Sequence, residues 1–226
     1  MRRVITLIVG MAIFLFYLLG CNSLSKSQKG VLIGAGAGGA VGAGIGKAAG
    51  NTALGAILGA SVGGVAGGII GKKMDKQAKE IEQIPGAEVK RVGEGINVTF
   101  DSGVLFNTDQ STLTSASQSK LSELAGILNK YPDTYILVEG HTDSSGATDH
   151  NSMLSKNRAD AVATYLEGRS VADQRIRTKW YGESQPKFSN DTKDNMAKNR
   201  RVEFAIYANE ALVNQAEREA TSSGGE

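Results

Sequence analysis

The sequence contains a single cysteine and only two histidines among its 226 residues. Because Cys21 has no second cysteine to pair with, a disulfide within the chain is excluded. So few thiolate and imidazole groups also leave little for a transition-metal site, and we expect no metal and no cofactor. The sequence also lacks a large excess of either charge, since it has 25 basic and 23 acidic residues. Without a broad basic surplus, we expect no nucleic-acid partner.

The N-terminus has the features of a secretory signal. Arg2 and Arg3 precede the apolar run 4–19, which is too short and wrongly flanked for a typical spanning helix. The run ends in Leu18-Leu19-Gly20-Cys21, which resembles a bacterial lipobox, where signal peptidase cleaves before a cysteine that carries diacylglycerol. We therefore expect Cys21 to be lipidated. The alternative is an uncleaved anchor with an incidental thiol.

Cleavage at this point would remove residues 1–20 and leave residues 21–30 as a lipidated linker. Loss of the two arginines makes the numbers of basic and acidic residues equal, so the mature protein would be formally neutral. Asn22 stands where an aspartate would signal inner-membrane retention in enterobacteria. We therefore expect delivery to the outer membrane, with the folded part facing the periplasm.

Glycine recurs at every fourth position in two arms, 34–50 and 55–71, which are separated by Asn51-Thr52 as a turn. Glycines four apart form a smooth groove on a helix, which lets a second helix approach closely in lipid. Each arm approaches the roughly 20 residues that a helix needs to cross a bilayer. Residues 31–71 are therefore predicted to form a glycine-zipper helical hairpin in or against the membrane.

The glycine arms have other interpretations. A flexible Gly/Ala linker is possible, although such linkers are usually polar and rich in serine. A nucleotide-binding loop at Gly34–Gly38 is rejected, because no strand precedes it and no acidic residue follows at the required distance. The hairpins of several chains could also assemble into a homo-oligomer or a pore.

A folded domain is predicted over residues 87–208, after a charged helical stalk over residues 72–86 that ends at Pro85-Gly86. Its expected elements are a β-hairpin of 87–91 and 96–100, a helix from a capping box at Ser115 to about Lys130, a strand at 135–139, a helix over 149–166, and strands at 175–181 and 201–207. This order predicts an α+β fold, a mixed α/β sandwich. Residues 209–226 are expected to be a frayed helix and a flexible tail.

Arg158 is a cation on the apolar face of the predicted helix 149–166, near the centre of that face at about 100° per residue. Asp143 lies in the polar turn after the strand 135–138. An acid at a strand end and a base on the next helix can converge on one pocket, which suits a ligand with both an ammonium and a carboxylate. Alternatively, Arg158 extends along the apolar face with its head in water, or closes an internal ion pair with Asp143.

Three short segments strengthen the interpretation as a ligand site. They are Gly140-His141-Thr142-Asp143, Leu154-Ser155-Lys156-Asn157-Arg158-Ala159 and Asn199-Arg200-Arg201-Val202-Glu203-Phe204. Together they closely resemble the signatures of the OmpA C-terminal-like family, the peptidoglycan-associated domain, over roughly Gly95 to Tyr207. The resemblance implies the fold of that family and non-covalent binding of the diaminopimelate stem peptide of peptidoglycan.

Carried over by position, the resemblance implies that Asp143 takes the ammonium of diaminopimelate and that Arg158 takes its carboxylate. Asn151 and Ser145 would add side-chain hydrogen bonds, and Arg200 would close the far wall of the site. The helical repeat independently puts Asn151 on the face that carries Arg158, two turns earlier.

The chain departs from the family between Val104 and Asp109. The family usually has a stretch of the Phe-Asp-Phe-Asp kind there, and this chain has Val-Leu-Phe-Asn-Thr-Asp. Phe106 and Asn107 keep part of that wall, so they are placed near the site.

These features predict a lipid-anchored, non-catalytic protein that tethers the outer membrane to peptidoglycan. An alternative is the membrane-embedded glycine-zipper oligomer or pore, with a periplasmic domain that grips the wall. A hydrolase is a third possibility, with His141 and Asp143 beside Ser144 or Ser145 as nucleophile. We expect no enzyme, because residues two apart in a turn would need a third orienting group and no nucleophile-elbow sequence is present.

Overall fold

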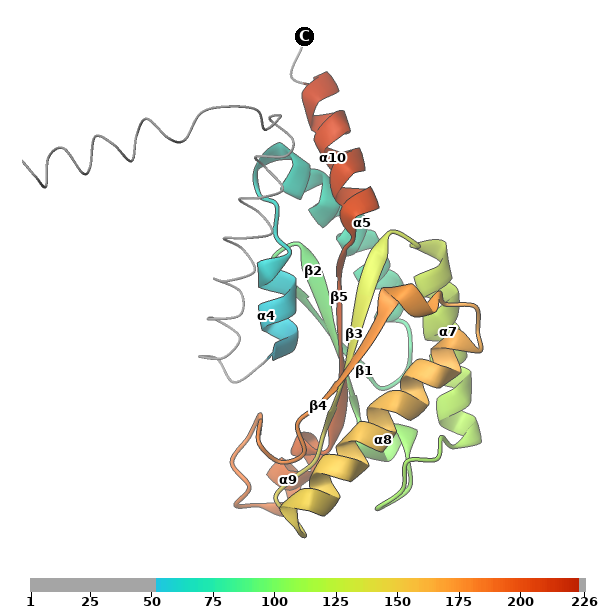
Figure 1. Cartoon of the computed structure of the whole chain (residues 1–226), viewed down its shortest axis with the longest axis vertical. Coiled ribbons are helices and arrows are strands. Elements are labelled where there is room, and N and C mark those ends of the chain that lie inside the picture. Colours follow the sequence, from blue (N-terminus) through green and yellow to red (C-terminus); the bar gives the residue numbers. More distant parts are fainter. Residues whose placement is uncertain (1–51, 224–226) are drawn as a thin grey trace, which may run out of the picture. The chain divides into compact units, whose positions relative to one another are not determined.

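The computed structural model describes residues 52–223, and within them five strands form one sheet in the order β1-β2-β5-β3-β4 (Figure 1). The strands are β1 Ala87–Val92, β2 Gly95–Asp101, β3 Thr134–His141, β4 Ile176–Trp180 and β5 Arg201–Ala208. All neighbours pair antiparallel except β3 and β4, which are parallel. A parallel pair needs a crossover connection, and the helix between β3 and β4 provides it. The predicted mixed α+β fold is confirmed.

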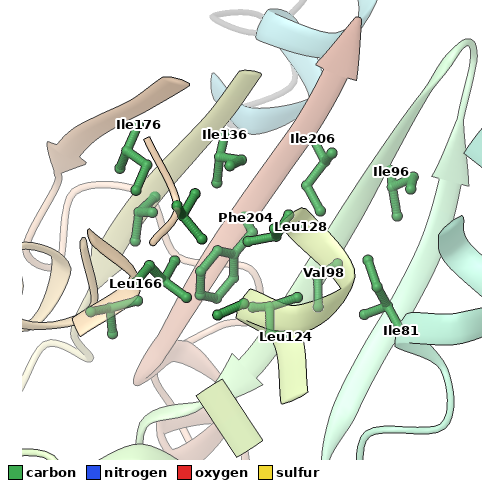
Figure 2. Close-up of a cluster of buried hydrophobic side chains, with 14 of the residues drawn as sticks. Ile81, Ile96, Val98, Leu124, Leu128, Ile136, Leu166, Ile176, Phe204 and Ile206 are labelled. Atoms are coloured by element: carbon green, nitrogen blue, oxygen red, sulfur yellow. The ribbon is translucent and has the colours of Figure 1, made fainter. Parts of the chain in front are cut away.

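Helices lie on both faces of this sheet. They are α4 Thr52–Gly59, α5 Gly64–Ile81, α6 Ser102–Leu105, α7 Ser115–Lys130, α8 Thr148–Glu167, α9 Lys193–Asn199 and α10 Glu210–Ser223, with a 3₁₀ turn, η2, at Asp173–Arg175. The main core lies between the sheet and helices α5, α7 and α8. Figure 2 shows its centre, where Leu124 and Leu128 of α7 and Leu166 of α8 surround Phe204 of β5.

The N-cap of helix α7 lies one residue before the N-cap that the sequence predicts. The N-cap is Thr114, whose side-chain oxygen accepts a hydrogen bond from the backbone N–H of Ser117 at 3.2 Å. Ser115 is already the first helical residue, so the predicted capping box at Ser115 is wrong. Thr114 takes the cap because it has the extended backbone that an N-cap requires.

The predicted stalk is part of a longer helix that belongs to the core. Helix α5 runs without a break from Gly64 to Ile81, and Ile70, Met74 and Ile81 on it are fully buried. Apolar residues recur every three to four positions along this helix, so one face packs on the domain while the lysines stay outside. The expectation of a separate stalk over residues 72–86 is therefore wrong.

The second glycine arm is two helices instead of one. Helix α4 ends at Gly59, and α5 begins at Gly64 with Gly63 as its N-cap; the φ angles of Gly63 and Gly64 are 74° and 63°. Positive φ is accessible to glycine and interrupts a right-handed helix. The prediction of one continuous helical arm over 55–71 is wrong for this reason. The first arm, Cys21 and the predicted signal peptide lie outside the described residues.

Helix α4 covers the sheet face opposite the main core. Its Ala53 and Ile57 are buried against Leu137 and Ala205, whereas the neighbours of those two strand residues face the main core. In Figure 1, α4 accordingly lies across the sheet from α7 and α8. Among the described residues, no helix has the combination of length and apolar character that a membrane crossing requires.

The C-terminal segment is a regular helix, contrary to the expectation of a frayed one. Helix α10 spans Glu210–Ser223, and its Leu212 and Ala216 are buried where it packs along α5. These two residues are four apart, so they lie on one face of the helix. The segment was misjudged because its partner, α5, was expected to be a detached stalk.

Candidate ligand-binding site

The side chains that the sequence and the family resemblance put forward line a single pocket of about 790 Å³. The pocket lies between the end of β3, the first half of α8, the segment around α6 and the end of α9. The predicted residues that line it are Phe106, Asn107, Asp143, Ser145, Asn151, Arg158 and Arg200.

A glycine allows the helix and the strand of this site to approach each other closely. A Cβ atom at Gly140 in β3 would overlap the backbone carbonyl oxygen of Ser155 in α8. Because Gly140 has none, α8 packs directly on β3 at Ser155, about one helical turn before Arg158. The convergence of acid and base therefore depends on Gly140.

Asp143 is a buried carboxylate, only 3% exposed. One of its oxygens, Oδ1, accepts a hydrogen bond from the backbone N–H of Ser145 at 2.9 Å, and Oδ2 forms an ion pair with Nη1 of Arg200. Burial alone would raise the pKa of Asp143, but these hydrogen bonds and the Arg200 charge hold it below its ordinary value. Asp143 therefore presents a negative charge to the pocket at neutral pH.

Arg158 is buried beside it, with 2% of its surface exposed. Its Nε donates to the backbone oxygen of Gln110 at 2.9 Å, and its guanidinium lies 5.4 Å from the ring centroid of Phe106. Burial lowers the pKa of Arg158, while Asp109 and Asp143 favour its charged form. An arginine side chain stays protonated in proteins, so the pocket also contains a positive charge.

Both alternatives for Arg158 are excluded by this geometry. Its head is not in water, because it is buried with the rest of the residue. Within residues 52–223, the ion pair of Asp143 is with Arg200, and no ion pair joins Asp143 to Arg158. Asp143 and Arg158 thus line the same pocket without closing on each other.

Polar atoms without hydrogen-bond partners also mark this pocket. Among the described residues, Nη1 of Arg158 and the hydroxyls of Ser102 and Thr142 are buried and lack partners. Leaving such a group unsatisfied costs about 1–3 kcal/mol. A ligand with hydrogen-bonding groups would remove that cost. Sequence reasoning missed Ser102, which has no periodic or spacing signal, and did not assign a role to Thr142.

Asn151 and Ser145 hold the turn that carries Asp143. The amide nitrogen of Asn151 donates to the backbone oxygen of Ser145 at 3.0 Å and to Oε2 of Glu183 at 2.6 Å. Ser145 contributes its backbone N–H to Asp143, as described above. Glu183 was missed because it lies in a loop between β4 and α9, far from the motifs in sequence.

Arg200 lines the pocket, where it was expected to close the far wall. Its guanidinium also pairs with Asp143, which was not expected, and 44% of its side chain stays exposed. Helix α9, a short helix that the sequence did not predict, ends at Asn199 and so places Arg200 at the pocket. Asn107 also lines the pocket, and its amide nitrogen donates to Oε1 of Gln110 at 3.3 Å.

His141 is buried between Tyr181 and Glu139. Its ring is 1% exposed, stacks on Tyr181 with 5.3 Å between centroids, and lies 3.8 Å from Oε2 of Glu139. Burial lowers the pKa of His141, although Glu139 opposes this shift. Among the described residues, neither ring nitrogen has a hydrogen-bond partner. The proton transfer from Ser144 or Ser145 that a hydrolase would need is therefore not prepared here.

Two family models match parts of the chain. Residues 105–200 match the OmpA family, and residues 1–75 match the YMGG-like Gly-zipper. The first match contains most of the pocket described above, and the second contains both glycine arms.

Curated relatives match over the same domain. "Probable lipoprotein YiaD" of Escherichia coli is 40% identical over 121 residues, which are 54% of this chain and 55% of that protein. "Peptidoglycan-associated lipoprotein" of Buchnera aphidicola is 38% identical over 96 residues, 42% of this chain and 54% of that protein. The chain thus spans about half the length of these relatives.

Among solved structures, a putative MotB-like protein from Desulfovibrio vulgaris shares the fold. It is 23% identical, with a TM-score of 0.55, and the match covers 63% of this chain and 91% of that one. This likeness bears on the fold alone. By sequence, residues 105–200 are similar to the OmpA family and residues 1–75 are similar to the YMGG-like Gly-zipper, and the fold is the one that this MotB-like protein has.

Proposed function

We propose that this protein is a non-catalytic peptidoglycan-binding lipoprotein that tethers the outer membrane to the cell wall. The observation that carries the proposal is a pocket lined by the buried carboxylate of Asp143 and the buried guanidinium of Arg158, which do not pair with each other. The OmpA-family match and the name of the Buchnera relative support peptidoglycan as the partner.

The ligand that fits best is the diaminopimelate of the stem peptide. Its ammonium would bind Asp143, which has room for further donors because a carboxylate has about four acceptor positions. Its carboxylate would bind the free Nη1 of Arg158, with the hydroxyls of Ser102 and Thr142 nearby. Charge-assisted bonds at both ends would distinguish this zwitterion from a singly charged side chain.

The anchor in this proposal is Cys21, which lies outside the described residues. A lipidated cysteine bearing two or more fatty chains holds a protein stably on a membrane, whereas one chain is marginal. The folded domain would then face the periplasm, where peptidoglycan lies. Asn22 after the cysteine favours the outer membrane.

Cosedimentation with purified sacculi tests the ligand site. Asp143→Asn and Arg158→Gln each remove one charge and keep the approximate shape, and each should weaken binding about tenfold or more, as expected for one charge-assisted hydrogen bond. Asp149→Asn and Arg169→Gln are matched controls, because they make the same charge changes at exposed positions outside the pocket. The controls should bind like the parent chain.

Folding must be checked in the same variants, because losing one charge can leave the other buried and unpaired. A cooperative thermal transition with weakened binding supports the assignment. If both site variants sediment with sacculi as the parent does, the site is wrong.

A further inference from the structure

A second pocket, of about 290 Å³, lies away from the candidate ligand site and shares none of its lining residues. It is formed by residues 73–77 of α5, the end of α7 with the loop that follows, and Leu212 of α10. Its lining includes three lysines, Lys73, Lys76 and Lys130, against one carboxylate, Asp133. The pocket is therefore positively charged.

Two of these lysines are available to a ligand. Nζ of Lys130 is bound to Glu80 at 2.7 Å, and the hydroxyl of Tyr131 donates to the same carboxylate at 2.7 Å. Within residues 52–223, Lys73 and Lys76 form no ion pair. They lie three residues apart on α5, so both ammonium groups can reach one anion.

A buried amide distinguishes this pocket from an ordinary charged helix face. Gln77, which lines the pocket, is 1% exposed, and among the described residues its Nε2 is buried without a hydrogen-bond partner. A buried N–H donor without a partner is costly and is normally satisfied in a folded protein. An acceptor bound in this pocket would satisfy it.

The C-terminal end of α7 does not cancel this positive character. The last carbonyls of a helix carry partial negative charge, which would repel an anion. Arg175 neutralises that end, because its guanidinium donates to the backbone oxygens of Leu128 and Tyr131, each at 3.0 Å. The lysines therefore dominate the local field.

We infer that this pocket binds a phosphate group. Lysine ammonium groups bind phosphate as point charges, and a phosphate has enough acceptor oxygens to take Lys73, Lys76 and the Gln77 amide together. The phosphate can belong to a phospholipid headgroup or be free in solution. The inference does not depend on peptidoglycan binding, since the two pockets are separate.

Titration with inorganic phosphate, at ionic strength held constant with chloride, tests the site. The full chain would be labelled with ¹³C at the methionine methyl groups and kept in an uncharged detergent. Met74 lines this pocket, whereas Met153 and Met196 lie on α8 and α9. Phosphate should shift the Met74 methyl signal saturably and leave the other two unchanged. No saturable shift at Met74 would overturn the inference.

Matched double variants separate a built site from general charge. Lys73→Ala with Lys76→Ala should weaken phosphate binding at least tenfold. Lys72→Ala with Lys79→Ala removes the same charge from the same helix outside the pocket, and it should change binding less than twofold. Equal weakening by both pairs would show screening of a lysine-rich surface and would refute the site.

Gln77→Leu keeps the volume of the side chain and removes the amide. It should weaken phosphate binding several-fold while the chain stays folded, and unchanged binding would remove Gln77 from the site.

Short-chain phosphatidylglycerol below its micelle concentration identifies the source of the phosphate. Tighter binding than inorganic phosphate at Met74 indicates a lipid headgroup, and weaker binding indicates a free phosphate. Both results keep the phosphate site.

Discussion

The ligand pocket and the glycine-rich segment differ in how far their sequence patterns specify their surroundings. At the pocket, an acid and a base fifteen residues apart were expected to converge, and they line one cavity. In the glycine segment, spacing by four suggested a helix in lipid, and residues 52–71 instead pack on the domain. A glycine repeat therefore allows another surface to approach the helix closely, but other parts of the sequence determine which surface that is.

The β1–β2 turn is the surface that approaches the glycine segment. The carboxylate of Glu94 accepts hydrogen bonds from the backbone N–H groups of Val62 and Gly63, at 2.6 and 2.7 Å. It thereby satisfies two donors just before α5, one of them the N–H of the N-cap residue Gly63, as the glutamate of a capping box would. A Cβ at Gly95 would overlap Ile57 of α4, so the close approach of α4 to this turn requires glycine at position 95.

The largest effect is expected from Gly140→Ala at the ligand pocket. The added Cβ would overlap the backbone of Ser155, which cannot move aside without shifting α8. We expect a loss of about 3 kcal/mol or more in the free energy of unfolding, measured by denaturant titration. Gly126→Ala on α7 is the control, because its Cβ meets nothing within 4 Å. That control should be neutral or stabilising by up to about 1 kcal/mol. Equal stability of both variants would mean that α8 does not pack this closely on β3.

Acid should destabilise the sheet face that α4 covers. Glu203 lies on this face with its Oε1 2.6 Å from Nε of Arg201, and Asn97 donates to its Oε2 at 3.1 Å. Burial alone would raise the pKa of Glu203, but Arg201 and the other partners lower it from 4.5 to about 2. A carboxyl with a lower pKa in the folded chain adds stability above pH 4.5 and loses it as the pH falls towards 2.

The expected loss is on the order of 3 kcal/mol in the free energy of unfolding between those pH values. Denaturant titrations from pH 7 to pH 2 would measure it. Glu203→Gln should flatten the curve in that window, whereas the exposed Glu123→Gln should leave it as in the parent. A parent curve that is level between pH 4.5 and 2 would contradict the assigned charge pair.

Long periodic elements were predictable from the sequence, and short ones were not. Helix α8 was expected over 149–166 and spans Thr148–Glu167. Helices α6 and α9, of 4 and 7 residues, were missed because one or two turns give no readable period. Helix α9 ends beside Arg200, so the ion pair of Arg200 with Asp143 was not predicted from the sequence. Asp143 and Arg158 reach one pocket because the first follows a predicted strand and the second lies on a long predicted helix.

The glycine segment was less predictable for a different physical reason. Glycine adopts positive φ as readily as negative φ, so spacing alone does not reveal where a helix breaks. Gly63 and Gly64 break it, and the N–H of Gly63 bonds to Glu94, thirty-one residues away. Such a contact depends on the tertiary fold, which local periodicity cannot specify.

The smallest effect is expected from adjacent glycines on α5. A Cβ at Gly67 would overlap the carboxylate of Glu94, whereas one at Gly68 meets nothing within 4 Å. Gly67→Ala should therefore lower the free energy of unfolding by about 1–3 kcal/mol, and Gly68→Ala should raise it by up to about 1 kcal/mol. Denaturant titration measures both changes against the same parent.

Combining Gly67→Ala with Glu94→Ala distinguishes packing on the domain from packing in lipid. If Gly67 is needed because Glu94 occupies the space beside it, the second substitution removes the overlap, so the double variant should be more stable than the sum of the two single changes predicts. A helix that used Gly67 to meet another helix in a membrane would gain nothing from the loss of Glu94. Strict additivity of the two changes in the free energy of unfolding would therefore contradict packing of the glycine segment on the domain and favour packing in lipid.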